Sequence, residues 1–145
     1  MRAVLTGATG FLGGAIMQSL LDDGWQVLAL GRNPEKMRTA LPQEVECGLF
    51  DLAEPKPPQN LRKDDIVIHC AALLGNADAD RNTYLRANTE SVIVLAMAAR
   101  KAEAGGFLFF SSVSANGPIG TEQKPLCEES PFRPASIYGE SKELA

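Results

Sequence analysis

Short apolar runs alternate along this chain with longer segments in which apolar residues recur every three or four positions. The first run, Arg2 to Thr6, predicts a strand. After a glycine cluster, Phe11 to Asp23 has the spacing of a helix that packs one face on a core. Four further runs predict strands, at Trp25 to Leu30, Val45 to Phe50, Ile66 to Ala72 and Phe107 to Phe110. This alternation is typical of parallel βαβ units with right-handed crossovers, so the predicted fold class is α/β with a doubly wound parallel sheet.

Capping and turn residues set the predicted ends of the other helices. Asn33 as N-cap and Pro34 at the first helical position predict a short helix after the second strand. The longest helix is predicted from Thr83 to Glu103, closed by Gly105-Gly106, and a last helix begins at Tyr138. Proline-rich stretches at 54–60 and 116–134 predict irregular loops.

Length and charge narrow the possible functions. The chain has 145 residues, which suits one domain over residues 1–145, and its 45% hydrophobic and 22% charged residues are ordinary for a globular protein. With a formal net charge of −4, the chain has no excess of positive charge with which to attract nucleic acid or an anionic membrane surface. No run approaches the length of a membrane span, and the N-terminus lacks the pattern of a signal peptide. We therefore expect no nucleic acid and no membrane among the partners.

Cysteine and histidine usage also excludes some kinds of site. The three cysteines, Cys47, Cys70 and Cys127, are an odd number without a CxxC pair, so they predict free thiols in a reducing cytosol. With His69 as the single histidine, the common zinc sites are nearly excluded, and no metal site is expected. The expected location is cytoplasmic.

Three glycines directly after the first strand carry the first functional signal. Gly7, Gly10 and Gly13 stand three residues apart and open the first helix, the context of a dinucleotide-binding loop. A helix N-terminus supplies unpaired N–H groups and a positive dipole end to phosphates, so an acidic protein can still bind an anionic cofactor there. The alternative is a glycine-rich turn that serves folding alone. The same loop contributes the candidate cofactor-binding residues Thr9, Phe11 and Leu12.

The end of the second strand bears on which dinucleotide binds. NAD-binding proteins commonly carry an acidic residue there for the ribose 2′-hydroxyl, but this segment reads Leu30-Gly31-Arg32-Asn33. The Arg32 guanidinium can pair with the 2′-phosphate of NADP instead. We therefore expect NADP in preference to NAD, although an exposed loop arginine without a ligand is a common alternative.

Tyr138 and Lys142 form a candidate catalytic pair. Their i, i+4 spacing places both on one face of a helix, where the lysine ammonium lowers the pKa of the phenol and suits it to proton transfer near neutral pH. The alternative is the start of a surface helix. Ser111 and Ser112 end the fifth strand, at the edge where doubly wound sheets bind ligands, so a serine there can contact a substrate oxygen, or can simply cap a turn.

These motifs together resemble the short-chain dehydrogenase/reductase superfamily, and more closely its extended branch, the NAD-dependent epimerase/dehydratase type with a Rossmann fold. The resemblance runs over essentially the whole chain, and its motifs are TGATGFLG from Thr6, Asp51-Leu52, HCAA from His69, Asn88-Thr89, FSSVSANG from Phe110 and YGESK from Tyr138. Three positions depart from the family pattern: Ser91-Val92 stands for the usual Gly-Thr, and Asn116 stands where tyrosine is common.

The resemblance implies a role for each matched residue. Asp51 and Leu52 would contact adenine, and Ala71, Ala72 and Asn88 would lie along the cofactor. Tyr138 would be the proton donor or acceptor. Lys142 would lower the pKa of Tyr138 and bind the nicotinamide ribose. Ser112 would orient the substrate oxygen; it is preferred to Ser111 because counting back from Gly117 places it on the family's serine, and strand alternation would then turn Ser111 toward the core.

The implied activity is an NAD(P)-dependent oxidoreductase or epimerase/dehydratase reaction on a hydroxyl or carbonyl carbon, with a nucleotide sugar as the expected substrate. Two alternatives stay open: an NADPH-dependent reductase of steroid-like or flavonoid-like ketones, and a dinucleotide-sensing regulator without turnover. Family members of this branch are longer and usually dimeric. We therefore expect this chain to be the N-terminal cofactor-binding part of a longer enzyme, without its substrate domain.

Overall fold

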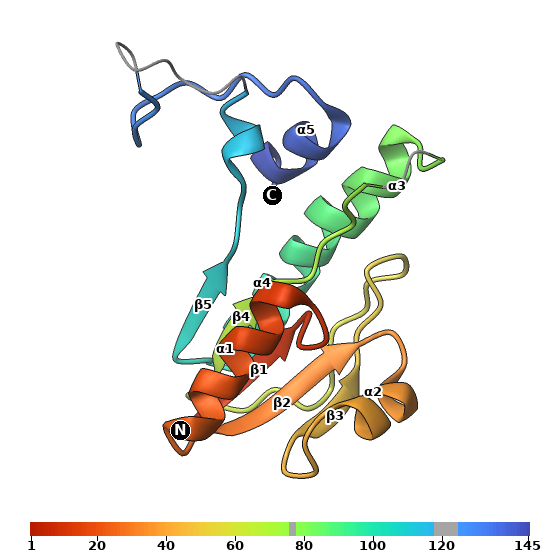
Figure 1. Cartoon of the computed structure of the whole chain (residues 1–145), viewed down its shortest axis with the longest axis vertical. Helices are drawn as coiled ribbons and strands as arrows, with labels where there is room; N and C mark the ends of the chain where they lie inside the picture. The colour runs from red at the N-terminus through yellow and green to blue at the C-terminus, as the bar shows by residue number, and fades with distance from the viewer. Residues whose placement is uncertain (76–77, 118–124) are drawn as a thin grey trace.

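Five parallel strands form one sheet in the order β3-β2-β1-β4-β5 (Figure 1). The computed structural model describes residues 1–75, 78–117 and 125–145. The strands are β1 (Arg2–Thr6), β2 (Gln26–Gly31), β3 (Glu46–Leu49), β4 (Ile66–His69) and β5 (Gly106–Phe109). The predicted doubly wound α/β sheet is confirmed, with strand ends a few residues from those expected.

Helices connect and flank the strands. They are α1 (Phe11–Asp22), α2 (Pro34–Ala40), α3 (Arg81–Leu85), the π-helical turn η1 (Arg86–Glu90), α4 (Ser91–Lys101), the 3₁₀ turn η2 (Val113–Ala115) and α5 (Ile137–Glu143). The predicted N-cap is confirmed, because the Asn33 side chain accepts the N–H of Lys36 at 2.9 Å. Among the described residues, no helix is long and apolar enough to cross a membrane.

The long helix differs from its prediction at its start, in its middle and at its end. It begins at Arg81 with Asp80 as its N-cap, and η1 interrupts it before α4. It ends at Lys101 without a glycine, because Glu103 itself takes the left-handed conformation at φ +55°. Closure by Gly105-Gly106 was therefore wrong: both glycine N–H groups bond to the Asp65 carbonyl, where β5 begins.

The two faces of the sheet carry separate cores. Alternate strand residues such as Ala3, Leu5 and Ile68 pack under α1 and α2, whereas Val4 and Val67 pack on the other side under α4. Because side chains alternate across a strand, runs that are apolar at every position must be buried on both faces.

A buried ion pair fixes the opposite, amino edge of the sheet. Arg2 on β1 donates two hydrogen bonds to the Asp65 carboxylate, at 2.8 and 2.7 Å, and a third to the Asn60 carbonyl at 2.7 Å. The N–H of Arg62 donates to the same carboxylate at 2.7 Å. Since Arg2 is 7% and Asp65 2% exposed, each charge depends on its partner for solvation.

Removal of one partner is therefore expected to be costly. Asp65→Ala leaves the Arg2 guanidinium buried with only the exposed Glu46 carboxylate at 3.7 Å as an ionic partner among the described residues, and should lower the free energy of unfolding by about 3–5 kcal/mol. Guanidinium denaturation followed by circular dichroism measures the change. The control is Glu35→Ala, which breaks the exposed pair with Arg38 and should cost less than about 1 kcal/mol. Equal losses in the two variants would contradict the structural importance of the buried pair.

Candidate functional site

A crevice opens at the carboxyl edge of the sheet, between the ends of β1 and β4. The connection from β1 leads to one side of the sheet and the connection from β4 leads to the other, so the strand order reverses here and leaves an opening. The crevice encloses about 930 Å³. Eleven of the predicted cofactor-binding residues line it: Gly7, Thr9, Gly10, Phe11, Leu12, Gly13, Arg32, Asp51, Leu52, Ala71 and Ala72.

The glycine loop is built so tightly that two of its positions exclude any side chain. Gly7 has φ +77°, and a Cβ added there would lie 2.9 Å from the backbone nitrogen of Ala71. A Cβ on Gly13 would lie 2.1 Å from the carbonyl oxygen of Gly7. The N–H of Gly10 closes the turn by donating to that same oxygen at 2.9 Å. The loop backbone itself therefore forms the floor of the crevice.

Helix α1 presents its N-terminus to this floor. Gly10 is its N-cap and supplies no side-chain acceptor, and the first turn carries no acidic residue. Backbone N–H groups and the positive end of the helix dipole therefore face the crevice without a protein partner from the cap or a neighbouring carboxylate. This arrangement suits a phosphate or pyrophosphate group.

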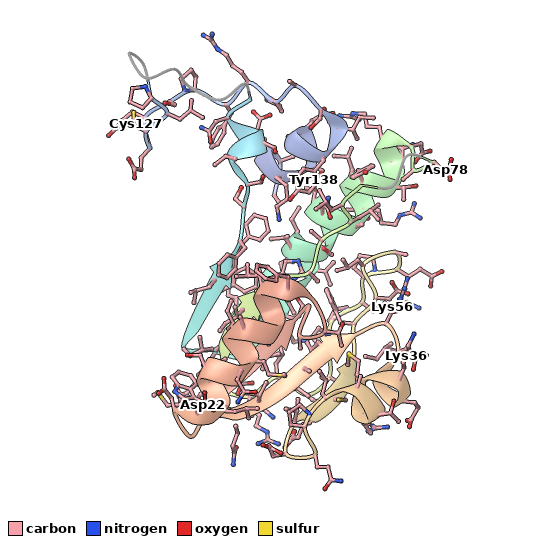
Figure 2. The ribbon with its side chains drawn as sticks, in the orientation of Figure 1. Asp22, Lys36, Lys56, Asp78, Cys127 and Tyr138 are labelled. Atoms are coloured by element: carbon pink, nitrogen blue, oxygen red, sulfur yellow. The ribbon has the colours of Figure 1, made fainter. Side chains whose placement is uncertain are left out.

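Cationic side chains stand on the wall formed by β2 and α2. Arg32 follows β2, and Lys36 lies in the first turn of α2 (Figure 2); both are exposed and both line the crevice. Lys36 was not singled out from the sequence, because its place on the wall depends on how the Asn33 cap starts α2. Asp51, after the neighbouring strand β3, also lines the crevice, and its carboxylate accepts the N–H of Ala53 at 2.9 Å.

The Tyr138–Lys142 pair lies on α5, beyond the carboxyl ends of the strands and beside α3 (Figures 1 and 2). The helix forms as predicted, with Ser136 as its N-cap. Lys142 is 4% exposed, and its ammonium lies 4.1 Å from the ring centroid of Phe109 at the end of β5. Burial lowers the pKa of Lys142 to about 8. Neither Tyr138 nor Lys142 lines the 930 Å³ crevice as the described residues form it.

Ser112 is the N-cap of η2, where its hydroxyl oxygen accepts the N–H of Ser114 at 3.1 Å. This capping role was the alternative to a substrate contact, but the hydroxyl proton remains able to donate to a further acceptor. The expected inward orientation of Ser111 was wrong. Ser111 is exposed, and its hydroxyl donates to the Lys142 carbonyl at 3.4 Å, because the chain leaves the strand at Phe109 and period-2 alternation ends there.

Asn88 sits behind the crevice wall instead of lining it. It is 1% exposed, and its amide bonds to the backbone of Leu73 and to the hydroxyl of Ser141. His69 is equally buried and pairs through Nδ1 with the Thr6 hydroxyl at 2.8 Å. Burial, assisted by the charge of Lys142, lowers the pKa of His69 to about 4, so its ring is neutral at physiological pH.

Metal chemistry has no support in the part of the chain that the structure describes. No group of three or more histidine, cysteine, aspartate or glutamate side chains there is arranged to hold an ion.

Comparison with known proteins places this geometry in a family. The model of the NAD dependent epimerase/dehydratase family matches residues 3–145. Methionine adenosyltransferase 2 subunit beta from Danio rerio is 30% identical over 97% of this chain and 41% of its own length. Ceramide reductase from Caulobacter vibrioides is 34% identical over 93% of this chain and 46% of its own length. The chain thus spans less than half of either relative.

Solved structures share the fold. A short-chain dehydrogenase/reductase superfamily protein from Agrobacterium tumefaciens, with bound NAD, superposes with a TM-score of 0.79 at 25% identity, over 99% of this chain and 42% of that one. MoeE5 in complex with UDP-glucose and NAD gives a TM-score of 0.78 at 29% identity, over 99% of this chain and 46% of that one.

The buried lysine yields a pH-dependent prediction. The pKa of the Lys142 ammonium is lower in the folded chain, about 8, than in the unfolded chain, about 10.5, so the unfolded chain binds this proton more tightly. Between these two pH values, the contribution of Lys142 to stability therefore rises with pH. Below pH 8 the folded state bears the cost of a buried charge, partly offset by the Phe109 ring. Lys142→Met should therefore raise the free energy of unfolding by about 1–3 kcal/mol at neutral pH, with the gain vanishing at high pH.

Denaturant unfolding at pH 7 and pH 10 tests this expectation. Lys56→Met, which replaces an exposed lysine, should change stability little at either pH. If Lys142→Met were less stable than the wild type at pH 7, or if its gain in stability did not depend on pH, burial would not be what lowers the pKa of Lys142.

Proposed function

The chain belongs to the NAD dependent epimerase/dehydratase family, and from that membership we propose that it is the NAD(P)-binding part of an oxidoreductase or epimerase/dehydratase acting on a nucleotide sugar. The observation that carries the proposal is the crevice at Gly7 and Gly13, whose backbone excludes side chains and faces a helix N-terminus without a side-chain cap. The nucleotide sugar follows from the likeness to a protein that binds UDP-glucose together with NAD.

The residues of the crevice fit a dinucleotide along its whole length. The glycine loop and the start of α1 suit the pyrophosphate, and Asp51 and Leu52, which also line the crevice, would contact the adenine. Ala71 and Ala72 leave room for a ribose beside β4. A bound nicotinamide supplies the hydride acceptor or donor for the reaction.

Proton transfer would fall to this chain's own side chains. Tyr138 as the phenolate would take the proton from a substrate hydroxyl as general base, and as the phenol it would donate the proton to a carbonyl oxygen as general acid. Lys142, four residues along the same helix, would stabilise the negative charge on the phenol oxygen when the proton leaves. The free hydroxyl proton of Ser112 would hydrogen-bond the same substrate oxygen and orient it.

The cations on the β2–α2 wall favour NADP over NAD. Arg32 and Lys36 both line the crevice beside the end of β2, where under this proposal they would bind a ribose 2′-phosphate, and the segment Leu30 to Asn33 offers no carboxylate for a free 2′-hydroxyl. The planar Arg32 guanidinium can form two parallel hydrogen bonds to a phosphate, which a lysine cannot do.

Arg32→Ala is expected to weaken binding of NADPH about 10- to 100-fold more than binding of NADH, since a charge-assisted hydrogen bond contributes about 1.5–3 kcal/mol. Fluorescence or calorimetric titration of the purified chain with both nucleotides measures the difference. Arg38→Ala removes an arginine on α2 that pairs with Glu35, and should leave both affinities unchanged. Equal loss for the two nucleotides would remove Arg32 from the specificity; no binding of either by the wild-type chain would overturn the proposed function.

Tyr138→Phe tests the proton transfer. In the full-length protein, with a UDP-hexose and the preferred cofactor, turnover should fall about 10²- to 10⁴-fold, because the general acid–base group is lost, while cofactor affinity stays within a few-fold. Tyr84→Phe is the matched control, since Tyr84 is the other of the two tyrosines and lies on α3. Retained turnover in Tyr138→Phe would exclude this phenol from the chemistry.

One relative favours a second substrate class. The 34% identity to a ceramide reductase supports a reductase of lipid-like ketones, built on the same crevice and the same Tyr138 and Lys142. Oxidation of NADPH by a long-chain ketone, with no reaction of UDP-sugars, would favour this second candidate. In the full-length protein, cofactor binding without turnover of either substrate class would favour a dinucleotide-sensing role.

A further inference from the structure

Ser141 occupies an unusual place between the two proposed catalytic side chains. It is 0% exposed, although it stands one residue before Lys142 and three after Tyr138. Its hydroxyl donates to the Tyr138 carbonyl at 2.7 Å and accepts the Asn88 amide N–H at 3.0 Å. A buried hydroxyl with both donor and acceptor capacity filled fixes the rotation of the helix that carries it.

Asn88 connects this hydroxyl to the crevice. Its amide oxygen accepts the N–H of Leu73 at 2.7 Å, and its amide nitrogen donates to the Leu73 carbonyl at 3.0 Å. Leu73 lines the crevice directly after Ala71 and Ala72. One side-chain amide therefore joins the wall of the crevice to α5, and every polar atom of that amide is engaged.

Thr89, the next residue of η1, makes a second attachment. Its hydroxyl donates to the Ser141 carbonyl at 2.8 Å. Two consecutive residues of the π-helical turn thus hold one residue of α5, through its side chain and its backbone. π-Helical turns are rare and concentrate at functional sites, in keeping with this unusual pairing.

We propose that Ser141 is a positioning residue that ties α5 to the crevice wall, so that a dinucleotide bound against Ala71–Leu73 orders the helix carrying Tyr138 and Lys142. The proposal rests on the proposed function, because it needs a dinucleotide in the crevice. Its physical basis is a chain of hydrogen bonds, Leu73–Asn88–Ser141–Tyr138, whose buried members have no water to replace a lost partner. Loss of the Ser141 hydroxyl breaks the chain at the link to α5 and leaves the wall intact.

Amide hydrogen exchange, measured with and without saturating NADPH, tests the coupling. In the wild-type chain, NADPH should slow exchange both in the glycine loop at residues 7–13 and in α5, the latter by about 5-fold or more. In Ser141→Ala the glycine loop should still be protected and the affinity for NADPH should stay within a few-fold. The additional protection of α5 by the nucleotide should be clearly smaller than in the wild type, because only the Thr89 attachment remains.

Ser91→Ala provides the matched control. Ser91 is also 0% exposed, and its hydroxyl donates to the Ala87 carbonyl at 2.6 Å, but it makes no hydrogen bond to α5. The same atom is thus removed from a buried site nearby, and the NADPH-dependent protection of α5 should survive. If Ser141→Ala does not fold, Thr89→Val replaces it, since it removes the second attachment with little change of shape and should reduce the coupling.

The outcomes separate the two proposals. Without protection of the glycine loop, the dinucleotide does not bind in the crevice and the proposed function fails. Protection of the loop with no effect on α5 in the wild type would overturn the inference about Ser141 alone. Loss of the coupling in Ser91→Ala to the same degree would also overturn it, because general loosening of the fold would then explain the effect.

Discussion

The site depends on how closely two strand ends approach each other at the middle of the sheet. Gly7, at the end of β1, leaves no space for a Cβ beside the backbone of Ala71. The Thr6 hydroxyl seals this contact, because it accepts the N–H of Ala71 at 3.1 Å and pairs with His69 at 2.8 Å. These contacts lock the ends of β1 and β4 at the point where the strand order reverses. Because these strand ends are fixed, the glycine loop is held at the floor of the crevice and the N-terminus of α1 is directed toward it.

The two sides of the site are held by different forces. Helix α1 packs on one of the apolar cores, so the glycine loop rests on a rigid base. Helix α5 buries Gly139, Ser141 and Lys142 and no large apolar side chain, so specific hydrogen bonds replace a hydrophobic face. Arg81 on α3 adds an ion pair with Glu140 on the exposed side of α5. An element held in this way opens more readily than a core helix, and its order is sensitive to each contact.

The sequence predicted what depends on local pattern and missed what depends on packing between distant segments. Strands that are buried on both faces appear in the sequence as continuous apolar runs. The tight loop is visible in the sequence because only glycine fits at positions 7 and 13. The π turn at Arg86–Glu90 has no such signature, since its residues are also acceptable in an α-helix. The docking of α5 through Ser141 joins residues about fifty positions apart, and a serine looks the same in a sequence whether it is buried or exposed.

Charge placement explains how an acidic chain can suit a strongly anionic ligand. The net charge of −4 acts at long range, where salt screens it over about 8 Å at physiological ionic strength. Within the crevice, the start of α1 and the side chains of Arg32, Lys36 and Arg86 present positive potential at contact distance. Near β5, Lys142 is a buried cation in apolar surroundings. The face of the Phe109 ring lies against its ammonium, and the His69 ring that stacks on Phe109 is neutral. A buried cation there stabilises an anion far more strongly than an exposed one would, so a phenolate or alkoxide oxygen that approaches Lys142 gains the most where water is excluded.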